Sequence, residues 1–377
     1  MPPVAAALDS LNAPLSWRQR VRHALRHALP TLGGQRLPAR WVIGVTGALA
    51  LVALVVASTH GAYALGAGEL WQVVLAVLTG AEPAGSGHLV FMHIRLPRLV
   101  LGAAAGAGLA LAGALMQGLF RNPLADPGLV GVSAGAALAA ATAIVLGGLW
   151  WPSLPRALGS WPLVGTAFAG GLLVTLLIYM LAQSASGTRV GMMLLAGVAV
   201  NALAGAGLGY LSFVSTDEQL RNLQMWLMGS LGGARWGTAM LVALAVCVAA
   251  VGAGWLARPL NALALGEAQA RLLGVPVERT KRLAIGVAAL AVGAVTAATG
   301  IIGFIGLVAP HGVRLLAGPD HRVVLPASAL LGAALVLLAD TVARTAVKPA
   351  ELPLGVLTAV LGAPLFLFML RQFRGRV

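Results

Sequence analysis

The chain has 377 residues, of which 59% are hydrophobic and only 10% are charged. Soluble domains carry about 25% charged residues, so the composition excludes an ordinary water-soluble protein and indicates an all-α, polytopic membrane protein. The formal net charge of +14 would favour a nucleic-acid partner for a soluble protein, but here it follows the membrane topology, and we expect no nucleic-acid partner.

The first residues form a basic segment that we expect to be a cytoplasmic tail, 1–40. It holds six arginines but no apolar core followed by a small-residue cleavage site, which argues against a cleaved signal peptide. The side chains of Trp17, Val21, Leu25 and Leu29 would share one face of a helix, a pattern typical of an interfacial amphipathic helix. A flexible basic tail that only sets the orientation fits equally well.

Hydropathy predicts ten transmembrane helices in a membrane domain, 41–371, which a short cytoplasmic tail, 372–377, follows. The helices are expected at about 41–60, 96–118, 129–149, 162–182, 190–213, 236–256, 283–301, 305–318, 323–345 and 354–371. The eighth is short for a full span. Part of 301–310 is therefore expected to be irregular backbone, which is tolerated where protein or a water-filled cavity covers it.

An even number of spans places both termini on one side of the membrane. With that side cytoplasmic, 18 of the 25 Lys and Arg residues lie inside and seven lie outside, as the positive-inside rule requires. Arg95, Arg98 and Arg344 then belong to the outer face, and Arg121 and Arg271 to the inner face.

Two connectors have the pattern of ordered structure. The outer segment 215–231 combines an N-cap signal with an acidic first turn, which predicts a short helix at the membrane interface. The inner loop 257–282 is expected to contain a short helix, a glycine turn at Gly274 and the start of a basic helix. Its apolar side chains could pack into a groove on a cytosolic partner; a solvated amphipathic loop is the alternative.

The segments that begin at Arg98 and Arg282 echo each other. Both start with R-L-x-x-G and end with Phe, and they are predicted to start on opposite sides of the membrane. This indicates an inverted repeat of helices 2–5 and 7–10, an architecture of transporters whose pathway lies at the repeat interface.

The sequence carries no sign of an enzyme. It has no G-x-x-x-x-G-K-[ST] phosphate loop, so it is not expected to hydrolyse ATP itself, and no metal-ligand spacing or cofactor motif. The single cysteine, Cys247, is expected to be a buried structural thiol. Asp340 is the one carboxylate well inside a span, and its spacing from Arg344 predicts a structural ion pair. A channel, the membrane half of a partner-driven machine, or an ion-coupled secondary transporter remain as classes.

Four blocks of sequence resemble a known family. They are Arg95–Ala136, Ala264–Val275, Gly300–Ala333 and Leu338–Phe366. Together they resemble the permease subunits of bacterial ABC importers for iron-siderophores, haem and vitamin B12, over nearly all of 41–371. The resemblance implies a homodimer with the pathway on its axis, in the lipid of the bacterial inner membrane. It also implies two ATP-binding cassette subunits on the cytoplasmic side and a periplasmic binding protein on the other.

The resemblance also implies roles for individual residues. Arg95, Arg98 and Arg344 would meet carboxylates of the binding protein, although snorkelling to lipid headgroups is an alternative. Asn122 and Leu124 would form a cytoplasmic gate, for which an ordinary solvated turn is the alternative, and the 184–188 connector would form a second gate element. Residues implied to contact the ATPase are Leu265, Gly266, Glu267, Arg271 and Gly274.

Three further points stay open in the sequence. Asn201 on the fifth helix would line the pathway or simply bond a neighbouring helix. His311 and Arg314 match a family motif whose chemistry the sequence does not reveal; for His311 we expect a structural hydrogen bond rather than haem ligation. Methionines near the fifth helix (Met192, Met193, Met225 and Met228) favour haem as the substrate over a ferric siderophore or cobalamin, although core packing explains them equally well.

Overall fold

The structure is a computed structural model. It describes residues 37–61, 68, 71, 86–150, 159–185, 187–347 and 350–373. Most of the expected basic tail, with its amphipathic pattern, and the residues after 373 lie outside the described residues.

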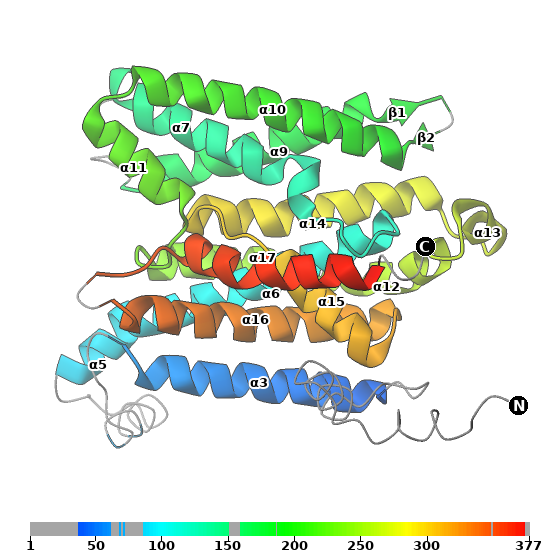
Figure 1. Cartoon of the computed structure of the whole chain (residues 1–377), viewed down its shortest axis with the longest axis horizontal. Helices are drawn as coiled ribbons and strands as arrows, with labels where there is room; N and C mark the ends of the chain where they lie inside the picture. The colour runs from blue at the N-terminus through cyan, green and yellow to red at the C-terminus, as the bar shows by residue number, and fades with distance from the viewer. Residues whose placement is uncertain are drawn as a thin grey trace, which may run out of the picture. The chain divides into compact units, whose positions relative to one another are not determined.

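Ten of the helices in the described part of Ala39–Val377 run side by side (Figure 1). They are α3 (Ala39–Thr59), α6 (Leu96–Leu119), α7 (Val132–Trp150), α9 (Trp161–Leu181), α10 (Val190–Val214), α12 (Trp236–Leu263), α14 (Val277–Thr299), α15 (Ile305–Ala317), α16 (His321–Thr345) and α17 (Leu354–Phe373). Seven of the described helices are long and apolar enough to span a membrane, and three further apolar helices are shorter. The ten predicted helices are confirmed.

Short elements mark the two ends of the helical unit (Figure 1). One end carries α11 (Asp217–Leu227), which a capping box at Thr216 starts, and α5 (Ser86–Val90); we call it the α11 end. The other carries α13 (Glu267–Leu272) and a hairpin of β1 (Gln183–Ser184) and β2 (Gly187–Thr188); we call it the α13 end.

Helix α6 lies at the centre of this unit. It packs against α12, α14, α15 and α16, and most of its residues are buried. Small residues make this possible: a Cβ added at Gly106 would overlap the backbone of Gly332 in α16, and one at Gly113 would overlap Gly306 in α15. Glycine therefore lets the backbones approach directly, as in other membrane helix pairs.

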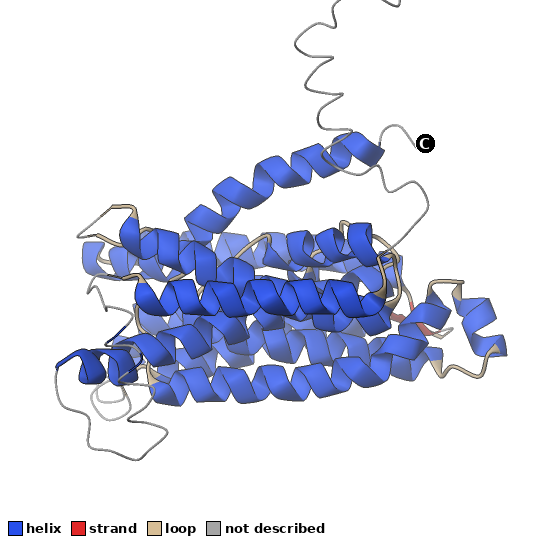
Figure 2. Cartoon of the chain, turned by 90° about the horizontal axis from the view of Figure 1, so that it is seen from below, coloured by secondary structure: helices blue, strands red, loops and turns tan. Residues whose placement is uncertain are grey.

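The packing follows the inverted repeat. Helix α6 packs against α15 and α16, while its counterpart α14 packs against α7 and α9, and the two contact each other. Helices α10 and α17 contact the equivalent pairs, and Figure 2 shows α17 inclined to the others. Helices α6 and α14 run in opposite directions between the two ends (Figure 1), as the inverted echo of Arg98 and Arg282 predicts.

The break before α15 is also where it was expected. Gly300 (φ +72°) and Phe304 (φ +66°) both adopt left-handed backbone, so residues 300–304 leave helical geometry. A Cβ at position 300 would overlap the carbonyl oxygen of Trp226, so only glycine fits there.

Three expectations need correction. The inner loop is shorter than 257–282, because α12 continues to Leu263. Pro259 lies inside this helix and removes one backbone hydrogen bond. Burial of Leu260 stabilises the last turn in spite of that loss. The second helix starts before residue 96, because α5 leads through a π-helical turn, η1 (Phe91–Arg95), directly into α6. Cys247 is exposed, since its side of α12 is apolar without being covered by protein.

We expect Gly113→Ala to destabilise the protein, because the new methyl group forces α6 away from α15. Overpacking of this kind costs roughly 1–3 kcal/mol, so the unfolding temperature in detergent should fall by several degrees. Gly254→Ala is the matched control, since its Cβ would meet nothing within 4 Å and alanine favours helix. Equal unfolding temperatures for the two variants would contradict the packing described here.

Candidate functional site

Charged side chains at the α11 end, all but one of them buried, form what we call the arginine cluster: Arg95, Arg98, Asp340, Arg344 and the exposed Glu351. The Arg98 guanidinium binds Asp340 (Nη2 to Oδ1, 2.9 Å) and Glu351 (Nη1 to Oε1 and Nη2 to Oε2, 2.9 and 2.8 Å). Asp340 also pairs with Arg344 (Nε to Oδ2, 3.0 Å), which confirms the predicted i,i+4 ion pair. One carboxylate thus bridges two arginines.

The same cluster fixes the end of α3. Arg344 donates from Nη2 to the carbonyl oxygen of Ala57 (3.2 Å) and from Nη1 to that of His60 (3.1 Å), and Arg95 donates to that of Ser58. Carbonyls at a helix C-terminus have no partner in the helix and carry partial negative charge, so cations bind there favourably.

Exposure separates the members of the cluster. The three arginines are only 5–9% exposed, and the side chain of Asp340 is 3% exposed, whereas the side chain of Glu351 is 41% exposed. The hydrogen bonds from Arg98 hold the pKa of Glu351 below its usual value, against the opposing effect of burial, so this carboxylate is ionised at neutral pH. Glu351 is therefore the member of the cluster that is most exposed to solvent. Docking of a partner at the arginines stays a prediction.

The connector between α6 and α7 is a tight turn whose polar side chains bind its own backbone. Oδ1 of Asn122 accepts from the Leu124 amide (2.9 Å), and Oδ1 of Asp126 accepts from the Gly128 amide (2.7 Å) at the start of η2 (Pro127–Val130). Short Asn and Asp side chains favour such turns. Burial raises the pKa of Asp126, against the effect of its hydrogen bond from the Gly128 amide.

Asn201 joins this connector to the fifth membrane helix, α10. Its Nδ2 donates to the carbonyl oxygen of Gly128 (3.3 Å), and Gly197, one turn earlier, packs on the carbonyl of Leu129. Asn201 therefore reaches the η2 turn beside Asn122 and Leu124. Within the described chain, its buried Oδ1 makes no hydrogen bond.

Helix α13 presents an apolar surface. Helix α13 lies between two glycines with positive φ angles, Gly266 (φ +117°) before it and Gly274 (φ +78°) after it. Leu265 is 65% exposed and Leu272 is 88% exposed. Arg271 lies 3.8 Å from Glu267, one turn earlier. The predicted short helix and glycine turn are confirmed.

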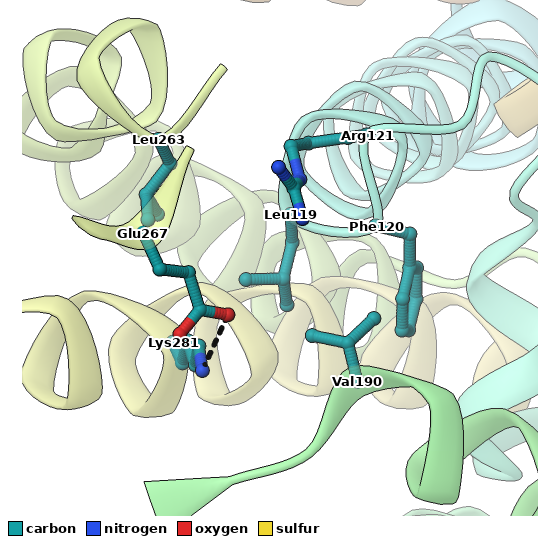
Figure 3. A pocket seen from close by; sticks show the side chains of 7 residues that line it. All are labelled: Leu119, Phe120, Arg121, Val190, Leu263, Glu267 and Lys281. Atoms are coloured by element: carbon teal, nitrogen blue, oxygen red, sulfur yellow. Dashed lines mark ion pairs between the residues drawn. The ribbon is translucent and has the colours of Figure 1, made fainter. Parts of the chain in front are cut away.

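Charged groups missed by sequence reasoning connect α13 to the rest of the protein. Lys281 Nζ contacts Glu267 Oε1 (2.8 Å), Glu278 Oε1 (3.1 Å) and the carbonyl oxygen of Thr188 (2.7 Å). Figure 3 shows Glu267 and Lys281 facing a small pocket that Leu119, Phe120, Arg121, Val190 and Leu263 also line. The i,i+3 spacing of Glu278 and Lys281 is the one signal that the sequence offered.

Arg314 and His311 lie on α15. Arg314 binds the side chain of Gln117 and the carbonyl oxygen of Ala114 (Nη2 to O, 3.2 Å), both on α6. His311 is buried, at 8% exposure. The contacts of Arg314 join α15 to α6, and the structural hydrogen bond expected for His311 stays a prediction.

A family model, the FecCD transport family, matches residues 45–372, nearly the whole helical unit. The chain belongs to the FecCD transport family. It is thus a multi-pass membrane permease of the ABC importer type, and the match spans the arginine cluster, the η2 turn and α13 alike.

Named relatives in the FecCD family transport different substrates. The chain is 43% identical to the hemin transport system permease protein HmuU of Yersinia pestis, over 90% of this chain and 98% of the relative. It is 42% identical to the vitamin B12 import system permease protein BtuC of Escherichia coli O127:H6, over 89% and 96%. The cobalamin import system permease protein BtuC of Halobacterium salinarum is 44% identical, over 83% of each chain.

A solved structure of the same fold is described as an inward-facing conformation of a transporter of the metal-chelate ABC type. It is similar with a TM-score of 0.77 and 30% identity, and covers 88% of this chain and 99% of that one. The likeness extends the family assignment to the three-dimensional arrangement of the helices.

We expect Asp340→Asn to be strongly destabilising, because it leaves two buried arginines without their shared counter-charge. Breaking one partner of a buried ion pair costs roughly 3–5 kcal/mol. Thermal unfolding in detergent measures this. Glu218→Gln, which removes an exposed carboxylate on α11 at the same end, is the control and should leave the unfolding temperature unchanged.

An unfolding temperature for Asp340→Asn within a degree or two of the wild type would mean that Asp340 does not neutralise the cluster.

Proposed function

We propose that this permease forms the pathway of an ATP-driven importer in the bacterial inner membrane, with both termini in the cytoplasm. Two copies would surround an axial pathway, two ATP-binding cassette subunits would hydrolyse the ATP, and a periplasmic binding protein would deliver the substrate. The observation that carries the proposal is the match along nearly the whole chain to import-system permeases at 42–44% identity. The chain itself has no phosphate-binding loop for hydrolysis.

Haem is the leading substrate in this proposal, with vitamin B12 or a ferric siderophore as alternatives. The hemin and vitamin B12 permeases are about equally similar to the chain, so identity does not separate them. Exposed methionines favour a large, flat, apolar ligand: Met192 is 46% and Met225 is 60% exposed, whereas Met193 is buried and serves the core.

The second copy of the permease would pack against the exposed surface of α10. This helix exposes Leu203 (72%) and Phe213 (86%), and Gly205 and Gly209 meet no atom within 4 Å. Membrane lipid covers part of such a surface, but small residues in a row also permit a close helix partner. Asn201 on the same helix would then lie near the dimer axis.

The ATPase subunits would contact α13. A compact helix with Leu265 and Leu272 exposed at the α13 end offers an apolar surface that water does not favour, and Glu267 and Arg271 supply charge at its rim. The placement of α13 on the cytoplasmic side follows from the Lys and Arg distribution.

The binding protein would dock at the opposite end, over the arginine cluster. Because Arg98 is buried and already holds two carboxylates, a partner's carboxylate reaches it where Glu351 now lies. Arg95 and Arg344 would supply the surrounding positive potential, which steers docking more than it adds affinity.

Purified permease and its ATPase, reconstituted in liposomes with the loaded binding protein, test the proposal. We expect ATP hydrolysis and uptake to rise with haemin, ferric siderophore or cobalamin, whichever is the substrate, and to persist when ion gradients are collapsed. Uptake that needs an ion gradient and no ATPase would instead establish a secondary transporter.

We expect Leu124→Gly to raise passive leak through the permease, because Leu124 would narrow the pathway beside Asn122. Efflux of the identified substrate from liposomes without ATP measures the leak. Leu265→Gly is the control, an exposed leucine at the same end but outside the gate. Equal leak in both variants would show that the connector is an ordinary turn and not a gate.

A further inference from the structure

Lys281 is a buried ammonium group with acceptors from three separate elements. It is 2% exposed, and its three N–H groups have the carbonyl oxygen of Thr188 (2.7 Å), Glu267 Oε1 (2.8 Å) and Glu278 Oε1 (3.1 Å) as partners. Thr188 belongs to the β1–β2 hairpin and Glu267 to α13, while Glu278 lies on α14 with Lys281 itself. One side chain thus holds all three elements.

The hairpin is attached to the same charges a second time. Oε2 of Glu278 accepts from the backbone amide of Thr188 (2.9 Å) and from its hydroxyl (2.8 Å). Gly187 (φ +108°) permits this approach, because a Cβ there would lie 2.6 Å from Oε1 of Glu278. The hairpin is therefore fixed to α14 by polar contacts that leave no room for a side chain.

The cost of leaving a buried ammonium without an acceptor keeps Lys281 and its three partners together. A buried ammonium that loses an acceptor carries a cost far above that of an exposed ion pair, so Lys281 stays with its three partners when one of them is displaced. Helix α13, by contrast, buries Ala270 in the core but exposes Leu272, and Leu265 just before it is also exposed. A force on α13 is therefore transmitted through Glu267 to Lys281.

The hairpin passes directly into α10. Thr188 is followed by Arg189, whose amide donates to the carbonyl oxygen of Ala182 (3.0 Å) and whose carbonyl starts α10 by accepting from the Met193 amide (3.0 Å). Three turns further along, Asn201 contacts the η2 turn. Displacement of Thr188 thus changes the position of the helix proposed to line the pathway.

We propose that Lys281 is the positioning residue that transmits displacement of α13 to the β1–β2 hairpin and, through it, to α10. The inference rests on the proposed contact of α13 with the ATPase subunits. Arg121, in the turn that leads to Asn122 and Leu124, borders the same pocket as Glu267 and Lys281 (Figure 3), so both gate elements lie beside this link.

Hydrogen exchange in the full-length permease, without any partner, tests the link. The decisive variant is Glu267→Gln, because Glu267 has no contact with the hairpin among the hydrogen bonds and ion pairs described. We expect exchange at the hairpin amides of Thr188 and Arg189 to become about tenfold faster, which corresponds to about 1.4 kcal/mol. Exchange in α11 should not change.

Two controls separate the link from general loosening. Arg271→Gln, on the same helix and 3.8 Å from Glu267, should leave the hairpin unchanged. Lys281→Met should loosen both α13 and the hairpin, Lys281→Arg should restore them, and Arg282→Met, which removes an exposed charge next in sequence, should do neither. Faster exchange in α13 alone after Glu267→Gln would overturn the proposal, as would a uniform increase through α6 and α14.

The reconstituted importer supplies the functional measurement. With Lys281→Met we expect the amount of substrate transported per ATP hydrolysed to fall about tenfold, and with Lys281→Arg to recover. An unchanged ratio would overturn the inference even where exchange changes. Failure of the wild-type permease to use ATP at all would refute the proposed function instead, while the partner-free exchange experiment still decides whether the link exists.

Discussion

Direct backbone contact along α6 is the constraint on which the rest of the structure depends. Gly106 against Gly332 and Gly113 against Gly306 bring α15 and α16 so close that no side chain fits between them. Apolar surface gains little by association in lipid, so close packing of this kind has to hold the helices together. Because α6 is fixed along its length, the segments at its two ends are fixed as well: the arginine cluster at one end and the η2 turn at the other.

Charge follows a common rule at both ends. Two cations removed from water are each surrounded by several acceptors, at least one of them distant in the chain: Arg98 by Asp340 and Glu351, and Lys281 by Thr188, Glu267 and Glu278. Buried ion pairs contribute little to stability by themselves, but removing one partner is costly, so each cluster ties its elements into one arrangement. Glu351 beside Arg98, and α13 beside Lys281, are exposed, so a partner can reach them.

A transporter has to convert force at one side of the membrane into an opening somewhere else. Coupling between distant sites is carried by chains of packed side chains, hydrogen bonds, salt bridges and rigid secondary-structure elements. In this FecCD permease, Thr188 binds the hairpin to α14, the hairpin continues along the chain into α10, and Asn201 binds α10 to the η2 turn; these contacts make up the link proposed above. The break at Gly300–Phe304 supplies the complementary irregularity in the second repeat.

The sequence by itself determined the ten helices, the inverted repeat, the capped helix after Thr216, the glycine turn at Gly274 and the Asp340–Arg344 pair. All of these depend on hydropathy, turn chemistry or spacing within one helix, which are local properties of the chain. The tertiary structure alone decided that Arg98 binds Glu351, 253 residues away, that Lys281 binds Thr188, and that Cys247 is uncovered. Hydropathy assigns a residue its depth in the membrane but not its neighbours, and those are set only when the helices pack.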